Sequence, residues 1–214
     1  MSSAPERLDQ RVARGEATRE QILDAAADVL RGEGGAATTT RAVAERAGVR
    51  LSLVHYHFGG KGNLLAELLD RENERLLERQ ERLYAGPEPL AAKWRTACGY
   101  LREDLRSGYA RVLWELWSAG LADEELARRW RDAMAGWRAL LETVAEQWAD
   151  LHGVELPLPA RALATLVANA FQGAEIEILA GVSEDEAPHF AALEACADLI
   201  EWFERTSQSR DRDR

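Results

Sequence analysis

Residues 38–61, TTTRAVAERAGVRLSLVHYHFGGK, decide the fold of this chain. A short helix is predicted in the first part of the stretch, because the hydroxyl of Thr39 or Thr40 can accept a hydrogen bond from an amide of the first turn. Apolar side chains then recur at the spacing of one helical face, at Val43, Ala44 and Ala47. The stretch therefore begins with a capped, one-sided helix.

A glycine and a second short helix follow. Gly48 supplies the turn, and a helix over about 51–57 places Val54 and Phe58 inward at i and i+4. A helix of this length is not stable by itself in water, so it must pack against other parts of the chain. Two short helices joined by a glycine-containing turn predict a helix-turn-helix motif.

The segments on either side of this motif follow a definite order. Residues 18–34, TREQILDAAADVLRGEG, predict a preceding helix, and VHYHF at 54–58 continues into Lys61 and the two leucines at 64–65. In composition and order, residues 18–65 resemble the TetR family of bacterial transcriptional regulators. The resemblance implies a DNA-binding regulator with a diverged helical ligand domain behind the helix-turn-helix.

A recognition helix presents donors and acceptors to base edges in the major groove, while neighbouring groups bind phosphates. Arg50, at the start of the second helix, can reach guanine O6 and N7 or a phosphate. Ser52 and His55 are the next candidates for base edges, and Leu51 can contact an apolar group such as the thymine methyl. The resemblance assigns phosphate contacts to Thr39, Thr40, Tyr56, His57 and Lys61. A partly structural Tyr56 and a His57 that serves packing alone are the alternatives.

No motif for a metal centre or an enzyme accompanies this stretch. His55 and His57 are two residues apart, so their side chains point about 200° apart on a helix and cannot bind one metal ion together. Cys98 and Cys196 have no nearby histidines, and the sequence has no HExxH or CxxC spacing and no glycine-rich phosphate loop after a strand. We therefore expect no enzymatic activity, no metal and no cofactor.

Length, charge and cysteine content set further limits. A chain of 214 residues, 46% of them hydrophobic, favours one short module and one larger domain. Two distant cysteines, no apolar leader and no run of membrane-spanning length predict a cytoplasmic protein that does not enter a membrane. The net charge is −10, but residues 1–62 carry +1 and the remainder −11. The acidic remainder would be repelled by DNA, which favours contact through the N-terminal end.

Hydrophobic periodicity predicts an all-α chain with no sheet, because no segment alternates with a period of two. A flexible arm over 1–16, either disordered or in contact with DNA, precedes a helix-turn-helix domain over 17–62. A helical effector-binding and dimerisation domain spans 63–206, and a frayed tail spans 207–214. Within the larger domain, helices are predicted over about 63–83, 88–106, 109–119, 123–151, 159–181 and 185–206.

Tryptophan is frequent in the larger domain, where six of the seven lie between residues 94 and 148. The resemblance places the effector site of relatives in this region. Aromatic rings offer apolar contact area and attract cations, so an apolar, aromatic or cationic small molecule is expected. The candidate lining residues are Trp94, Tyr109, Trp114, Trp117, Met134, Trp137 and Phe171. Several of them recur at helical spacing, which is also typical of a core, so either role is open for each tryptophan.

The last two predicted helices have two apolar faces each, and one helix face is enough for a core. Small residues on the second face allow close helix approach, so a symmetric four-helix contact between two copies of the chain is expected. The residues predicted in this homodimer interface are Leu166, Asn169, Gly173, Ile176, Leu199, Trp202 and Phe203. A thick monomeric core is the alternative.

Two hypotheses about function follow. The first is a homodimeric repressor that binds a palindromic operator in double-stranded DNA and is released by a small-molecule effector. The alternative is a helix-turn-helix protein without ligand control, whose distal domain recruits a protein partner. Activation in place of repression is compatible with both hypotheses.

Overall fold

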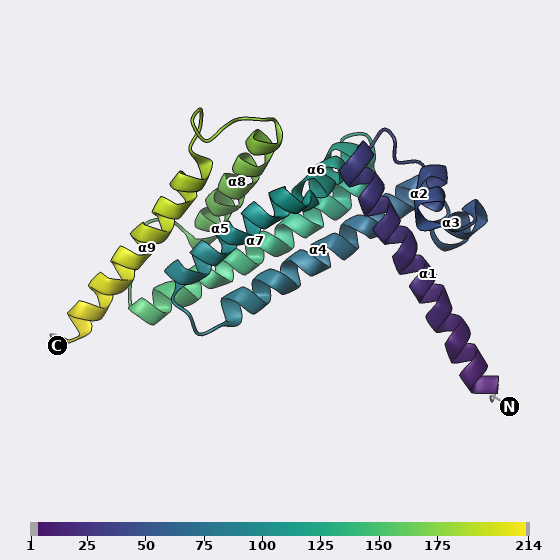
Figure 1. The fold of residues 1–214 in the computed structure, drawn as a ribbon. Helices are drawn as coiled ribbons and strands as arrows, with labels where there is room; N and C mark the ends of the chain where they lie inside the picture. The colour runs from purple at the N-terminus through teal and green to yellow at the C-terminus, as the bar shows by residue number, and fades with distance from the viewer. Residues whose placement is uncertain (1–3, 213–214) are drawn as a thin grey trace. The chain divides into compact units, whose positions relative to one another are not determined.

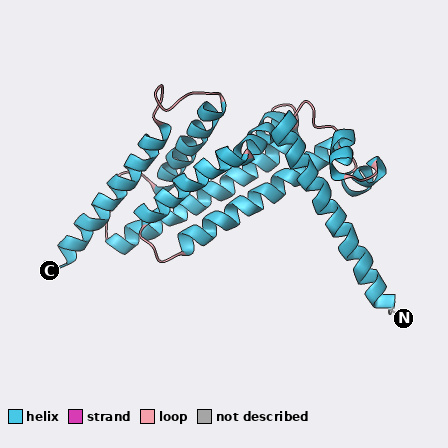
Figure 2. Ribbon diagram, in the orientation of Figure 1, coloured by secondary structure: helices cyan, strands magenta, loops and turns pink. Residues whose placement is uncertain are grey.

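In the part of the chain that it describes, the computed structural model consists of helices joined by loops and turns (Figure 1, Figure 2). It describes the backbone of residues 4–212 and the side chains of residue 10 and residues 12–206. No strand occurs in residues 4–212, so the predicted all-α class is confirmed. None of the helices in this range combines the length and the apolar content that crossing a bilayer requires.

The helix boundaries lie close to the glycines and prolines of the sequence. Pro89 and Pro159 immediately precede two of the helices, where the missing N–H of proline costs nothing. The helices are α1 (Ala4–Glu33), α2 (Thr40–Ala47), α3 (Leu51–Phe58), α4 (Lys61–Ala85), α5 (Leu90–Ser107), α6 (Tyr109–Gly120), α7 (Glu124–His152), α8 (Ala160–Leu179) and α9 (His189–Arg212).

Both ends of the chain are more helical than predicted. The expected flexible arm over 1–16 belongs to α1 from Ala4 onward, and the expected frayed tail belongs to α9 as far as Arg212. The N-terminal stretch is rich in residues with high helix propensity, and at both ends a helix that is nucleated by packing in one part propagates easily into the next. The first three residues and residues 213–214 lie outside the described part.

The chain forms two compact units. Unit 1 comprises Met1–Glu72 and Arg111–Trp130, and unit 2 comprises Asn73–Ala110 and Arg131–Arg214. The sequence places a single boundary after residue 62, whereas unit 1 extends further along α4 and also takes in most of α6 and the start of α7. The reason is apolar burial, because Val112, Leu116 and Leu126 belong to the same core as the N-terminal helices.

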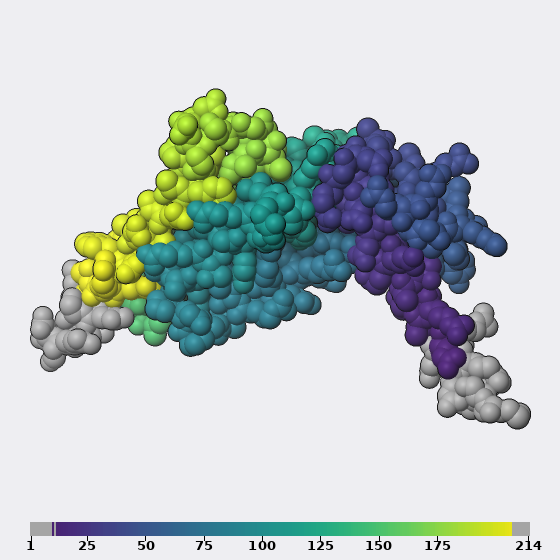
Figure 3. Space-filling model, viewed as in Figure 1, coloured from purple at the N-terminus to yellow at the C-terminus, as the bar shows by residue number. Residues whose placement is uncertain are grey.

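In unit 1, the α2–α3 pair lies beside α1 (Figure 3). Its core is made of fully buried aliphatic side chains, among them Ile22 and Leu23 of α1 and Leu64 and Leu68 of α4. Polar contacts fix the same helices, since Gln21 of α1 donates a hydrogen bond of 2.7 Å to the carbonyl oxygen at the end of α2. The long helices of unit 1 therefore hold the two short ones in place.

In unit 2, rings from three helices meet in the core. Trp94 of α5 and Trp137 of α7 both pack edge-on against Phe171 of α8, with ring centroids 5.5 and 6.4 Å away. The indole N–H of Trp94 donates to the carbonyl of Leu193 at 2.7 Å, which links α5 to α9. These three rings therefore take part in the core of unit 2.

Gly48 and Gly99 offer a matched test of this local structure. Gly48 has φ of 67°, and Gly99 lies inside α5, while an added Cβ would meet nothing within 4 Å at either position. We expect Gly48→Ala to lower the free energy of unfolding by roughly 1 kcal/mol, because alanine is strained in the left-handed region. Gly99→Ala should raise it by about 0.5–1 kcal/mol, since alanine favours a helix interior. Urea denaturation measures both, and a loss of stability in both variants would contradict the prediction.

Candidate functional site

The first helix of the motif is capped by Thr39. The residue has an extended backbone, with φ of −109° and ψ of 156°, and its Oγ1 accepts a hydrogen bond of 3.1 Å from the backbone N–H of Ala42. Of the two predicted cap residues, the structure thus selects Thr39, and Thr40 is the first residue of α2. Thr38 is buried, and its hydroxyl donates to the carbonyl of Gly34 at 2.9 Å.

The turn of the motif closes through two backbone hydrogen bonds. The N–H of Gly48 donates to the carbonyl of Glu45 at 3.2 Å, and that of Val49 donates to the carbonyl of Ala44 at 3.0 Å. This pair of bonds is the Schellman arrangement that ends a helix at a left-handed residue. The turn therefore depends on glycine at position 48 and directs the chain into α3.

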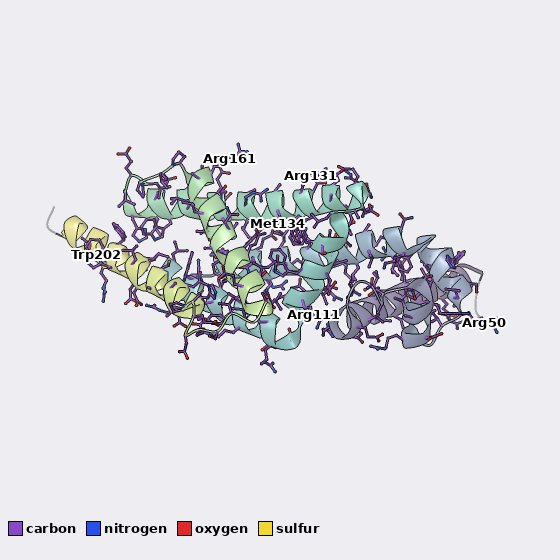
Figure 4. All side chains as sticks on the ribbon, turned by 90° about the horizontal axis from the view of Figure 1, so that it is seen from above. Arg50, Arg111, Arg131, Met134, Arg161 and Trp202 are labelled. Carbon is purple, nitrogen blue, oxygen red and sulfur yellow. The ribbon has the colours of Figure 1, made fainter. Side chains whose placement is uncertain are left out.

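The register of α3 separates a buried face from an exposed one. Val54 and Phe58 are buried, while Tyr56 is 80% exposed. The side chains predicted to reach base edges share the exposed surface, which carries Arg50, Leu51, Ser52 and His55. Figure 4 shows Arg50 at the outer edge of unit 1. The predicted base-reading residues are thus all accessible to solvent.

The predicted phosphate contacts differ in their environment. Tyr56 and Thr39 are exposed, whereas Thr40 and His57 are partly buried. The rings of Tyr56 and His57 meet edge to face, with centroids 5.1 Å apart. The ammonium of Lys61 donates to the carbonyl of Gly35 at 3.0 Å, so this lysine also binds the loop between α1 and α2.

The α1–α2 loop has a second partner that sequence analysis missed. The backbone N–H of Gly35 donates to Oε2 of Glu115, on α6, at 2.9 Å. An added Cβ at Gly35 would lie 2.9 Å from the same oxygen, and one at Gly34 would lie 3.2 Å from Oε1. Two glycines in a row are thus needed for the carboxylate to approach. The Gly-Gly pair was the available signal, but the partner lies 80 residues further along the chain.

The seven residues predicted to line one ligand pocket are divided between the two units. Trp114 and Trp117 pack on one another in unit 1 with centroids 5.2 Å apart, and Trp130 lies 6.3 Å from Trp114. The other five belong to unit 2, where Met134 is buried and its sulfur accepts a hydrogen bond from Gln172. Those five are Trp94, Tyr109, Met134, Trp137 and Phe171.

Unit 2 contains a cavity with an almost wholly apolar wall, which we call the apolar cavity. Its volume is about 300 Å³, and α4, α5, α7, α8, α9 and the loop before α8 supply its wall. Of the predicted ligand residues, Trp94 lines it. The lining residues are Tyr84, Leu90, Trp94, Leu141, Val144, Ala145, Trp148, Leu156, Pro157, Leu163, Ala164, Val167, Cys196, Leu199, Ile200 and Phe203.

A second cavity of unit 2, of about 310 Å³, has a mixed wall with several charged groups, and we call it the polar cavity. Four residues line both cavities, so the two adjoin: Tyr84, Leu90, Val144 and Trp148. The other residues of the polar cavity are Pro87, Glu88, Pro89, Lys93, Gln147, Leu151, His152 and Glu204.

Glu204 is the buried charged group of the polar cavity, with 6% of its surface exposed. Its Oε1 accepts hydrogen bonds from the backbone N–H of Leu90 at 2.8 Å and from the indole N–H of Trp148 at 3.2 Å. The ammonium of Lys93 donates to the carbonyl of Tyr84 at 2.8 Å. Burial raises the pKa of the Tyr84 phenol to about 12, so this hydroxyl is uncharged at neutral pH.

The predicted dimer residues lie on outward faces of α8 and α9. Leu166, Leu199 and Trp202 are each more than half exposed, and the rings of Trp202 and Phe203 meet with centroids 4.8 Å apart. Figure 4 shows Trp202 on α9. Asn169, Gly173, Ile176 and Phe203 complete the set, and Gly173 is half-buried.

No group of three or more histidine, cysteine, aspartate or glutamate residues is arranged to hold a metal ion in the part of the chain with described side chains. The Nδ1 atom of His55 lies 3.3 Å from the carbonyl oxygen of Gly59.

Comparisons with known proteins agree with this geometry. Residues 22–68 match the family model of bacterial regulatory proteins, tetR family. A transcriptional regulator from Rhodococcus sp. Rha1 is 25% identical, with a TM-score of 0.71 over 85% of this chain and 95% of its own. A TetR transcription regulator from Haloarcula marismortui is 21% identical, with a TM-score of 0.72 over 86% and 96%.

A third similar structure is the transcriptional regulator FadR from Bacillus subtilis in complex with stearoyl-CoA. It is 17% identical, with a TM-score of 0.68 over 85% of this chain and 96% of its own. A comparison with curated protein sequences gave no match. Residues 22–68 thus match the N-terminal segment of the TetR family of bacterial transcriptional regulators, and the chain shares the fold of these regulators.

The contact between Glu115 and Gly35 can be tested by substitution. We expect Glu115→Ala to lower the free energy of unfolding by about 1–2 kcal/mol, because the half-buried N–H of Gly35 loses its acceptor. Glu115→Gln keeps an acceptor oxygen and should cost less. Urea denaturation and hydrogen exchange of the Gly35 amide report the effect.

The matched control for this test is Glu103→Ala, which removes an exposed glutamate that pairs with Arg106 within α5. Its effect on stability should be within about 0.5 kcal/mol. Unchanged exchange of the Gly35 amide in Glu115→Ala would show that the contact does not hold the loop.

Proposed function

We propose that the protein is a homodimeric repressor that binds a palindromic DNA operator and leaves it when a small-molecule effector binds. The observation that carries the proposal is the exposed face of α3, which gathers donors and acceptors opposite a fully buried face. An eight-residue helix with this division is suited to the major groove. The match of residues 22–68 to the tetR family model supports the same function.

On DNA, Arg50, Ser52 and His55 would contact base edges, and Leu51 an apolar group. Arginine can bind guanine through both O6 and N7, which makes Arg50 the strongest candidate for sequence preference. Tyr56, His57 and Lys61, together with the threonines before α2, would bind phosphates. Lys61 has three donor hydrogens, so its bond to Gly35 leaves donors for a phosphate oxygen.

The exposed apolar faces of α8 and α9 support a homodimer. Leu166, Ile176, Leu199, Trp202 and Phe203 are all exposed, and large apolar side chains gathered on one surface favour a partner. A twofold dimer would present two copies of α3 to two half-sites, roughly one helical turn of DNA apart. The operator would then be palindromic.

The apolar cavity is the proposed effector site. Its volume of about 300 Å³ lies in the range of small-molecule sites. FadR from Bacillus subtilis, which holds stearoyl-CoA, supports ligand control for a chain of similar fold. α4 and α7 each have residues in both units, so a change in unit 2 can reach unit 1 through continuous helices. Effector and DNA would oppose one another through a coupling free energy that is equal in both directions.

Selection of duplexes from a random DNA pool with the purified protein tests this function. We expect a palindromic sequence to be enriched and its affinity to fall steeply with salt, because phosphate contacts release counterions. Arg50→Ala should lower affinity for that sequence by about 10- to 100-fold, the effect of one good arginine–guanine contact.

The control for the binding measurement is Arg31→Ala, since Arg31 lies on α1 and pairs with Asp28 at 2.8 Å. It should bind nearly as well as the unchanged protein. Failure of the folded protein to enrich any sequence would count against the proposal and favour the protein-recruiting alternative.

The dimer surface has its own test. Leu166→Glu replaces an apolar side chain that is 56% exposed with a charged one. The fold should be retained, while the charge would disrupt the interface. We expect sedimentation velocity to show a monomer for this variant and a dimer for the unchanged protein. Leu121→Glu, at a residue that is 73% exposed in unit 1, should stay dimeric. A dimeric Leu166→Glu would exclude this face as the main contact.

A further inference from the structure

The two cavities of unit 2 adjoin one another. Tyr84, Val144 and Trp148 line both, so a ligand in one cavity reaches the wall of the other. The apolar cavity is bordered by aliphatic and aromatic side chains, whereas carboxylates, an ammonium and an imidazole gather in the polar cavity. A ligand that fills both must have an apolar body and a polar head.

The balance of charge in the polar cavity decides the sign of that head. Glu88 and Glu204 contribute two carboxylates, and Lys93 contributes one ammonium. The ammonium is bound at 2.8 Å by the carbonyl of Tyr84. Since the carbonyl of Trp148 can only accept, His152 donates to it through Nδ1 at 2.9 Å. The compartment is thus net negative when the imidazole is neutral, which favours a cation.

Glu204 also occupies the position where an anion would bind. The N–H groups at the start of a helix attract negative charge, and α5 begins at Leu90. The N–H of Leu90 already donates to Oε1 of Glu204. An anionic head would therefore meet a buried carboxylate there, while a cationic head would be attracted to it.

Aromatic rings also border the polar cavity. Trp148 donates its indole N–H to Glu204 at 3.2 Å, which places the ring beside the carboxylate. It packs with the imidazole of His152, with centroids 4.8 Å apart. Tyr84 adds a second ring to the shared wall. Indole and phenol rings attract alkylammonium groups through their faces.

We propose that the two adjoining cavities together bind one amphipathic amine, with its apolar body in the apolar cavity and its ammonium head beside Glu204 in the polar cavity. The role of this ligand as the effector rests on the proposed function, whereas its binding does not. The simpler role of Glu204, as a cap for the first N–H of α5, predicts no preference for the charge of a ligand.

Three probes with alkyl chains of similar length separate these roles: decyltrimethylammonium, 1-decanol and decanoate. The two charged probes are used below their micellar concentrations and the alcohol below its solubility limit. Titration calorimetry on the protein of 214 residues measures their affinities. We expect the ammonium to bind at least about tenfold more tightly than the alcohol, and the carboxylate to bind most weakly. Glu204→Gln keeps an oxygen acceptor for both N–H groups, and should lose the preference for the ammonium while affinity for the alcohol is unchanged.

Gln147→Lys provides a second variant, because Gln147 is an exposed residue of α7 that lines the polar cavity and the fold should tolerate a lysine. It should weaken binding of the ammonium and strengthen binding of decanoate. Glu146→Gln is the control, since this neighbouring glutamate is exposed and does not line either cavity. Its ligand preference should equal that of the unchanged protein.

The outcomes separate this proposal from the proposed function. Binding of the alcohol or decanoate without preference for the ammonium would overturn the proposal that the ligand is an amine. A preference that survives both variants would overturn it as well. Either result would remain compatible with the apolar cavity as the effector site. Absence of binding by all three probes would contradict the effector cavity as well. Tight binding of the ammonium that leaves operator affinity unchanged would establish the site and reject its role in release from DNA.

Discussion

Burial of one face of each short helix in the motif is the constraint on which unit 1 depends. α2 and α3 have eight residues each, too few for stable helices in water. They persist because Val43, Ala47, Val54 and Phe58 enter a core that α1 and α4 complete. A large apolar side chain contributes about 1.5–3 kcal/mol when it leaves water. The same burial turns the opposite face of α3 outward, so the stability of the motif and the presentation of Arg50 have one cause.

The placement of this motif involves residues outside it. The loop before α2 is held from two sides, by the ammonium of Lys61 and by the carboxylate of Glu115. Both contacts use backbone atoms of Gly35, where a larger residue would exclude the carboxylate. Because Glu115 belongs to α6, part of the chain beyond α5 is structurally a component of the unit that contains the helix-turn-helix. Unit 1 is therefore made of two separate stretches of the chain and is not one continuous segment of the sequence.

In unit 2, the roles of the aromatic residues are divided. Trp137 and Phe171 fill the core, while Trp148 borders two cavities and binds the carboxylate of Glu204. A buried carboxylate is costly unless it is hydrogen-bonded, and the first N–H of α5 together with an indole N–H provides that compensation. A charge stabilised in this way beside an apolar space is suited to select a ligand by its head group.

Local chemistry made the helix-turn-helix predictable, because the cap at Thr39, the turn at Gly48 and the inward pair Val54 and Phe58 each depend on residues a few positions apart. The all-α class followed from the same periodicity. The tertiary structure alone decided which tryptophan rings are in contact, and which carboxylates accept hydrogen bonds from distant backbone N–H groups. Glu115 and Glu204 act on backbone amides 80 and 114 residues away in the chain. Contacts over such separations arise when helices pack, and the spacing of residues along a sequence carries no information about them.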